Sequence, residues 1–283
     1  MSTYKLGLYE KAMPGNLPLV EKLAAVQEAG YDFMELSIDE TDEKLARLDW
    51  TDAEICALRR DTETATTPVS SICLSGHRRF PLGDPDRATR ERGLAVMEKA
   101  IRLASRLGVR LIQIAGYDVY YKQGDKNTRA AFAENLERSA EIAAAHAVTL
   151  AFETMETPFL NTVEKAMYWV HTINSPWLNV YPDLGNITCA AEGDSGRVRA
   201  DLESGRGRIS ALHLKETRPG VFREVPYGEG HVDFAKGIQT AWALGVRMYT
   251  AEFWWTGGAL ATDDSWKTML RWNEKFLRDV FQN

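Results

Sequence analysis

The chain has 283 residues, of which 45% are hydrophobic and 26% charged, and its formal net charge is -6. An acidic balance opposes binding along a nucleic-acid backbone, which requires a broad basic surface, so we expect no nucleic-acid partner. Residues 1–10 lack the uninterrupted apolar stretch of a signal peptide or a membrane span, so we expect a cytoplasmic protein with no membrane partner.

Short apolar runs alternate with longer amphipathic segments along the whole sequence, which is typical of βα units around a parallel sheet. In chain order, the runs predicted to be strands are 6–9, 33–36, 69–74, 111–115, 148–153, 178–182, 209–213 and 248–252. Apolar residues at three- and four-residue spacing predict helices over 17–29, 86–107, 128–145, 163–173 and 264–280, and a further helix starting near Asp233.

Glycines punctuate this alternation. Gly30, Gly108 and Gly245 each follow a helical pattern and precede a predicted strand, as expected for left-handed C-terminal caps. Eight strand–helix pairs in a chain of this length predict a closed (β/α)8 barrel, whereas a doubly wound sheet would more often carry a glycine-rich phosphate loop after its first strand. No linker is visible, so we expect residues 1–283 to form a single barrel domain, although the length alone would permit two.

Four consecutive predicted strands end on a side chain that can bind a metal, namely Glu153, Asp183, His213 and Glu252. One such residue is often only a helix cap or a solvated loop residue. The C-terminal strand ends of a (β/α)8 barrel surround one mouth, however, and three carboxylates gathered there repel one another and require a cation. This oxygen-rich set suits Mn2+, Mg2+, Co2+ or Zn2+. A cation there would acidify the C–H beside a ketose carbonyl, which indicates enolisation chemistry.

Two stretches carry more specific information, HisArgArgPheProLeuGly at 77–83 and AlaGlyTyrAspValTyrTyr at 115–121. Further motifs are GlyLeuTyrGluLys at 7–11, SerIleAspGluThrAsp at 37–42, ArgLeuAspTrp at 47–50, TyrProAspLeuGlyAsn at 181–186, HisLeuLysGluThrArgProGlyValPhe at 213–222 and ValProTyrGlyGluGly at 225–230. Over nearly its whole length the chain resembles the L-ribulose-5-phosphate (L-xylulose-5-phosphate) 3-epimerases of the xylose isomerase-like TIM barrels. The first two stretches are specific to this phosphosugar group, whereas the four strand-end residues recur across the wider superfamily.

The resemblance implies an isomerase-class carbohydrate epimerase of pentose phosphate metabolism that interconverts L-xylulose 5-phosphate and L-ribulose 5-phosphate through a cis-enediolate. It also implies that Glu153, Asp183, His213 and Glu252 hold one divalent metal ion, and that Glu153 and Glu252 are the acid–base pair. Two opposed carboxylates can remove a proton from one face of the sugar and return one to the other. By analogy with related barrels, we expect a homodimer.

Eight further residues are candidate substrate contacts: Glu10, Lys11, His77, Arg78, Arg79, Asn186, Lys215 and Arg218. The two arginines and the histidine beside them would capture phosphate, which a guanidinium matches in a bidentate manner, unless they form only a surface charge pair. Lys11 is a second candidate for phosphate and Glu10 for sugar hydroxyls, with an exposed ion pair as the alternative. Lys215 and Arg218 are candidates for stabilising the enediolate or the terminal end of the substrate, with a charge on the rim of the loop as the alternative. Asn186 stands where some related ketose epimerases carry a histidine.

Other activities share parts of this pattern. An aldose–ketose isomerase would use the same metal and glutamates but move protons between C1 and C2, and a 3-epimerase could act on a related, unphosphorylated ketose. An abasic-site endonuclease needs more histidine ligands and a basic face, and a sugar-phosphate sensor would not need two proton-transfer glutamates. The four ligands therefore indicate metal-assisted enolisation, and the resemblance is what selects a phosphosugar 3-epimerase.

Overall fold

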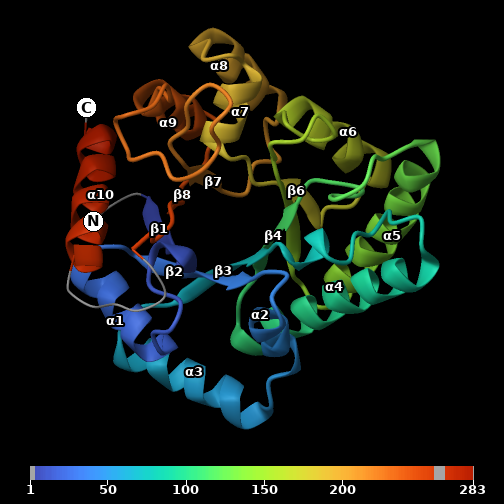
Figure 1. Cartoon of the computed structure of the whole chain (residues 1–283), viewed down its shortest axis with the longest axis horizontal. Helices are drawn as coiled ribbons and strands as arrows, with labels where there is room; N and C mark the ends of the chain where they lie inside the picture. The colour runs from blue at the N-terminus through green and yellow to red at the C-terminus, as the bar shows by residue number, and fades with distance from the viewer. Residues whose placement is uncertain (1–3, 258–264, 283) are drawn as a thin grey trace.

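The computed structural model describes residues 4–257 and 265–282, in which strands and helices alternate along the chain (Figure 1). The strands are β1 (Lys5–Tyr9), β2 (Phe33–Ile38), β3 (Val69–Leu74), β4 (Leu111–Ala115), β5 (Thr149–Glu153), β6 (Leu178–Val180), β7 (Leu212–Leu214) and β8 (Met248–Ala251). The α-helices are α1 (Leu19–Ala29), α2 (Asp42–Ala46), α3 (Asp52–Thr64), α4 (Arg87–Leu107), α5 (Lys126–Ala145), α6 (Val163–Ile173), α7 (Leu184–Ala190), α8 (Ser195–Ser204), α9 (Phe234–Ala243) and α10 (Ser265–Gln282). Three 3-10 helices are η1 (Glu10–Ala12), η2 (Arg47–Asp49) and η3 (Gly76–Arg78).

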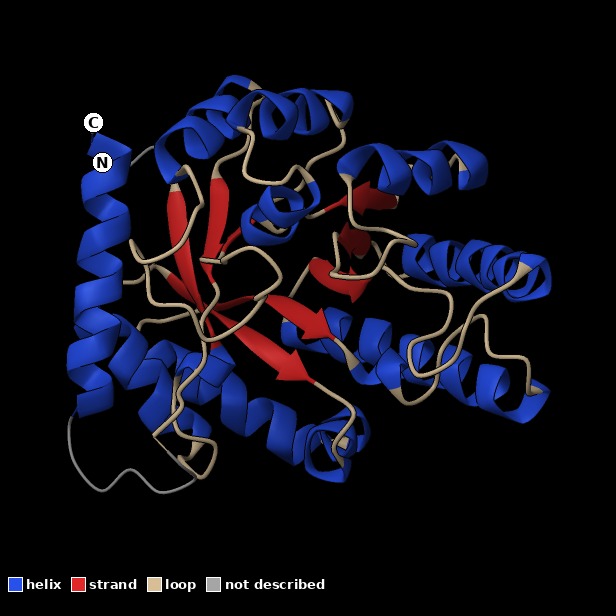
Figure 2. Cartoon of the chain, turned by 45° about the horizontal axis from the view of Figure 1, so that its top comes forward, coloured by secondary structure: helices blue, strands red, loops and turns tan. Residues whose placement is uncertain are grey.

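The strands form one parallel sheet in the order β6-β5-β4-β3-β2-β1-β8-β7. Its two outer strands are linked by parallel bridges, Val180 to Ile209 and Asp183 to His213, so the strands enclose a common interior. The helices surround these central strands in both views (Figures 1 and 2). The predicted (β/α)8 barrel is therefore confirmed.

Side chains on a barrel strand alternate between the surrounding helices and the barrel interior. Leu6 and Leu8 of β1 join Val26 of α1 in the large apolar cluster, and all three are fully buried. Burial of each such side chain stabilises the folded state by roughly 1.5–3 kcal/mol. The interior holds a small apolar cluster of Leu111, Ala151, Tyr181 and Ala211. It also holds polar side chains, since Glu35 of β2 reaches His213 on β7, a strand that is not its neighbour. A polar interior beneath the mouth of the barrel is what positions the candidate site.

Most of the predicted boundaries agree with the structure to within two residues. Gly30 and Gly108 cap α1 and α4 in the left-handed conformation, with φ of 95° and 82°. Gly245 is also left-handed, one residue beyond the α9 cap. The prediction was wrong in missing α2, α3, α7 and α8. Asp264, where the last helix was predicted to begin, lies outside the described residues.

Within the described ranges, none of the helices combines the length and the apolar character that a membrane crossing requires.

Candidate metal centre and substrate pocket

The four predicted ligands lie together at the C-terminal mouth of the barrel. Glu153 ends β5, Asp183 is the N-cap of α7, His213 lies in β7 and Glu252 directly follows β8. One ligand atom from each lies within 4.8 Å of the others, and all four residues are buried. Side chains from four consecutive βα units thus converge on one point, and they are able to hold a divalent cation.

The contacts within this cluster are polar and close. Nδ1 of His213 is 2.8 Å from Oε2 of Glu252 and 3.3 Å from Oε1 of Glu153. Nζ of Lys215 is 3.3 Å from Oδ1 of Asp183. Oδ2 of Asp183 is buried and has no hydrogen-bond partner among the described residues. A buried carboxylate oxygen is costly to leave unpaired, so the donor set fits a cation that would use this oxygen.

The protonation of the cluster is strongly perturbed. Burial raises the pKa of Asp183 well above its usual range, against the opposing charge of Lys215. Burial and the neighbouring Glu252 also raise the pKa of Glu153. Burial alone would raise the pKa of Glu252 too, but Lys215 and His213 hold it well below its usual range. The surroundings of the two glutamates therefore shift their pKa values in opposite directions, as in other acid–base pairs.

Two supporting side chains lie behind the ligands, and the sequence analysis missed both. Gln113 Nε2 donates a hydrogen bond to Glu153 Oε2, and Glu35 Oε1 is 2.6 Å from Nε2 of His213. Both are fully buried in strands that are otherwise mostly apolar, PheMetGluLeuSerIle and LeuIleGlnIleAla. A charged or amide side chain within a buried strand was the available signal, because such groups are rarely buried without a partner.

A cavity of about 60 Å³ opens beside the cluster. Both glutamates line it, together with four of the predicted substrate contacts, Lys11, Arg78, Asn186 and Lys215. The remaining lining residues are Tyr9, Cys73, Ser75, Met155, Glu156, Phe222, Arg223 and Trp254. The cavity thus places a cationic, partly aromatic wall next to the two glutamates.

Two side chains of this cavity keep unused hydrogen-bonding atoms. Nε of Arg78 is buried without a partner among the described residues, and its guanidinium lies 5.0 Å from the ring centroid of Tyr120. Asn186 donates from Nδ2 to the carbonyl oxygen of Thr154, while its Oδ1 is buried and unpartnered in the same part of the chain. These atoms offer one donor and one acceptor to a ligand.

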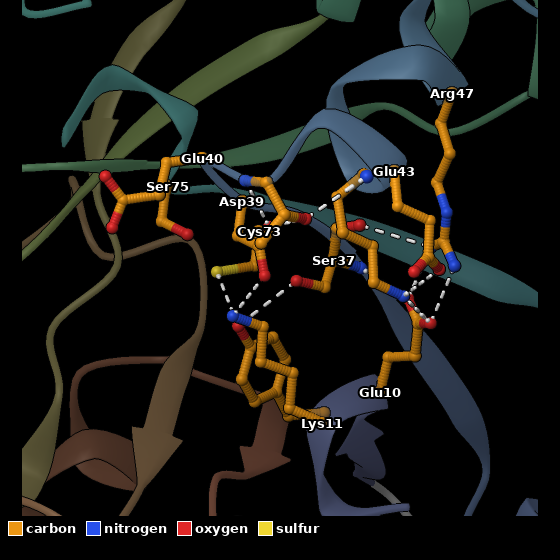
Figure 3. A network of polar contacts seen from close by, with 12 residues as sticks. Glu10, Lys11, Ser37, Asp39, Glu40, Glu43, Arg47, Cys73 and Ser75 are labelled. Atoms are coloured by element: carbon orange, nitrogen blue, oxygen red, sulfur yellow. Dashed lines mark hydrogen bonds and ion pairs between the residues drawn. The ribbon is translucent and has the colours of Figure 1, made fainter. Parts of the chain in front are cut away.

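Glu10 does not reach the cavity, which corrects its predicted role as a sugar contact. Its carboxylate is fully buried and lies 2.9 Å from Lys22, 2.7 Å from Lys44 and 2.6 Å from Arg47. Figure 3 shows Glu10 turned toward Arg47, whereas Lys11 points to Asp39, 2.5 Å away. Both Glu10 oxygens are taken by cations, so this residue is a structural counter-ion.

Three further predicted contacts also lie outside the cavity lining. His77 is buried, with Nε2 3.0 Å from the carbonyl oxygen of Gly93 in α4. Arg79 is exposed and pairs with Asp42 at 2.6 Å. Arg218 is half exposed and pairs with Glu229 at 2.9 Å. The histidine thus packs against α4. The two arginines form surface ion pairs, which is the alternative that the sequence left open for them.

We expect Glu10→Gln to destabilise the fold by about 3–5 kcal/mol, because it leaves three buried cations without their counter-charge. Burial would raise the pKa of Glu10, but Arg47, Lys22 and Lys44 hold it well below its usual range. The stabilisation is therefore complete above the pKa of the unfolded chain, about 4.3, and is lost as the pH falls through the folded-state value. Urea unfolding between pH 3 and 7 measures this, and an unchanged pH slope in the variant would contradict it.

Comparison with known proteins agrees with the fold. The family described as xylose isomerase-like TIM barrel matches residues 23–276. The chain is 45% identical over 250 residues to the L-ribulose-5-phosphate 3-epimerases UlaE of Salmonella heidelberg (strain SL476) and Escherichia coli O157:H7, covering 88% of this chain and 87% of each relative.

Solved structures give the same barrel at low sequence identity. A D-psicose 3-epimerase with D-tagatose from Clostridium cellulolyticum H10 superposes with a TM-score of 0.80 at 17% identity, covering 98% of this chain and 99% of that one. An L-ribulose 3-epimerase gives a TM-score of 0.78 at 19% identity, covering 100% and 96%. At such identities the likeness establishes the fold alone.

Fold and site together therefore define an isomerase-class barrel enzyme. The chain belongs to the xylose isomerase-like TIM barrel family and, within it, to the group of the L-ribulose-5-phosphate 3-epimerases. This membership confirms the resemblance found in the sequence and the prediction of an epimerase.

Proposed function

We propose that this enzyme is a divalent-metal-dependent 3-epimerase that interconverts L-xylulose 5-phosphate and L-ribulose 5-phosphate. The observation that carries the proposal is the arrangement of Glu153 and Glu252. They come from β5 and β8, which are not neighbours in the sheet, and both line one cavity beside a cluster able to hold a cation. The similarity to the UlaE relatives supports the substrate.

The cation would be held by Glu153, Asp183, His213 and Glu252, which suit Mn2+, Mg2+, Co2+ or Zn2+. When bound, it supplies Lewis-acid polarisation of the ketose carbonyl and so makes the proton on C3 more acidic.

The two glutamates transfer the protons. Burial would raise the pKa of Glu252, but Lys215 and His213 hold it well below its usual range, so Glu252 would act as the base that removes the C3 proton in one direction. Glu153 has a raised pKa and returns a proton to the other face of the cis-enediolate. In the reverse direction the two exchange roles, as reversibility requires. Their unequal environments match the requirement for one acid and one base in the same site.

The rest of the cavity would bind the substrate. Asn186 Oδ1 is free to accept a hydrogen bond from a sugar hydroxyl. Lys11, Arg78 and Arg223 would supply positive charge for the phosphate, and Arg223 also lies 3.8 Å from Glu156. Charge-assisted hydrogen bonds to phosphate are stronger than neutral ones.

Adjacent arginines give a matched test of the phosphate contact. We expect Arg78→Ala to lower kcat/KM for the phosphorylated ketose by about 10- to 150-fold, corresponding to a lost charged hydrogen bond of about 1.5–3 kcal/mol. Arg79→Ala should leave it unchanged, because Arg79 is exposed and pairs with Asp42. Steady-state assays with phosphorylated and free ketose measure this. An equal loss for both ketoses would remove Arg78 from the phosphate site.

Isotope exchange tests the reaction itself. The metal-loaded enzyme is incubated with L-ribulose 5-phosphate in D2O and followed by NMR. We expect deuterium at C3 together with the appearance of the C3 epimer. Deuterium at C1 without exchange at C3 would instead indicate an aldose–ketose isomerase, and the 3-epimerase proposal would fail.

A further inference from the structure

Behind the candidate metal ligands, Glu35 of β2 faces the far side of the His213 ring. Its Oε1 is 2.6 Å from Nε2 of His213, whereas Nδ1 of the same ring faces Glu252 and Glu153 at 2.8 and 3.3 Å. Glu35 and His213 are both fully buried. The two ring nitrogens therefore have separate surroundings, one toward the candidate metal position and one toward Glu35.

Glu35 is itself held from three sides. Its Oε2 accepts hydrogen bonds from Oγ of Ser71 at 2.6 Å and from the hydroxyl of Tyr181 at 3.1 Å. The Tyr181 hydroxyl lies 2.6 Å from Oγ1 of Thr250. Since Tyr181 donates its proton to Glu35, Thr250 is the donor in that second bond. All these side chains are fully buried, and the Tyr181 ring meets the His213 ring edge-on with centroids 4.7 Å apart.

A neutral imidazole carries one ring proton, and the hydrogen bond made by one nitrogen determines which nitrogen is free to bind a metal. A carboxylate accepts but does not donate, so when a cation replaces the proton that Nδ1 shares with Glu252, Glu35 keeps the remaining ring proton on Nε2. It also increases the basicity of the ligand nitrogen. Nδ1 is the nitrogen that points at the other ligands.

The cost of burying Glu35 argues against a purely structural role. Glu10, the other fully buried glutamate described above, is neutralised by Lys22, Lys44 and Arg47. Within the described residues, the one basic side chain in an ion pair with Glu35 is His213. A buried carboxylate with so little neighbouring positive charge costs free energy to bury, and an amide or an apolar side chain would fill the same space.

We propose that Glu35 is a positioning residue that fixes His213 in the Nε2–H tautomer, with Nδ1 as the metal ligand, and so strengthens cation binding. This inference rests on the metal site of the proposed function. It concerns how tightly the cation is held, so it can be tested by cation binding without turnover.

Binding of Co2+ to metal-free protein provides the test, followed by calorimetry and by the visible absorption of the bound ion. We expect Glu35→Ala to weaken Co2+ binding by about 10- to 100-fold, the usual effect of removing a residue that supports a metal ligand. Glu35→Gln keeps a neutral acceptor for Nε2–H but loses the charge, so it should fall between wild type and Glu35→Ala. Asp201→Asn is the matched control, since Asp201 caps α6 by accepting from the backbone N–H groups of Val163 and Glu164.

Several outcomes are distinguishable. Wild-type protein that does not bind Co2+ would remove the metal site and the proposed function with it. If the wild type binds Co2+ and both folded Glu35 variants bind it with an affinity within twofold of the wild type, the role of Glu35 is overturned and the metal site is not. Should Glu35→Ala fail to fold, Tyr181→Phe and Glu35→Gln carry the test, with the thermal midpoint of each metal-free protein as the check on folding. Unchanged Co2+ affinity and absorption in both would overturn the inference.

Discussion

Replacing either Glu153 or Glu252 with glutamine is expected to lower kcat for epimerisation by about 10²–10⁴-fold, because each glutamate transfers one of the two protons. Glutamine has nearly the same shape, and its oxygen can still approach a cation. The loss should therefore appear in kcat more than in metal content, which is measured on the same samples. Glu229→Gln is the control, since Glu229 is exposed and pairs with Arg218 outside the cavity.

The two variants should also differ from one another in isotope exchange. A variant that lacks the base for one epimer cannot remove the C3 proton of that epimer. Its remaining glutamate can still remove the C3 proton of the opposite epimer and exchange it with solvent. We therefore expect Glu153→Gln and Glu252→Gln to incorporate deuterium into opposite epimers without converting them. Incorporation into both epimers by either variant would mean that a single base serves both faces.

Removal of the cation is expected to abolish activity and to lower thermal stability. Three carboxylates, His213 and Lys215 remain in the buried cluster, and the repulsion among the carboxylates is then relieved by protonation or by the positive charges of Lys215 and protonated His213. A ligand present at a thousand times its dissociation constant stabilises the folded state by about 4 kcal/mol, so re-addition of metal should raise the unfolding midpoint.

The measurement uses exhaustively chelated protein with verified metal content, assayed before and after each divalent ion is restored. Asp183→Asn is an informative companion, because it keeps one oxygen and removes a charge from the residue whose Oδ2 is unpartnered among the described residues. Full activity in protein shown to be free of metal would exclude the metal-assisted route.

The barrel could be predicted from the sequence because each strand is a short apolar run whose signal is local. The missed helices have weaker local signals. α7 is short, and its sequence LeuGlyAsnIleThrCysAla contains poor helix formers. α3 is the exception, because a capping box between Thr51 and Glu54 marks its start in the sequence.

The candidate ligands could also be predicted, since strand ends of a barrel meet at one mouth whatever the details of packing. Only four of the eight candidate substrate contacts line the cavity, because a side chain's direction depends on contacts that are distant in sequence. Arg78 and Arg79 are adjacent, yet the first lies over Tyr120 and the second pairs with Asp42. Glu10 directly follows β1, where a residue on the rim of the barrel would stand. Lys22 and Lys44 from later helices bind its carboxylate, however, and Glu10 is buried beneath them.

The burial of Glu10 beside the cavity residue Lys11 has a practical consequence for redesign of this enzyme. The backbone carbonyl of Lys11 accepts a hydrogen bond from the N–H of Trp255, and its side chain reaches the cavity, while the preceding residue anchors three cations. A library that randomises both positions would lose most of its members to misfolding. Varying Lys11 alone would keep the scaffold intact, so changes in substrate preference could be selected there.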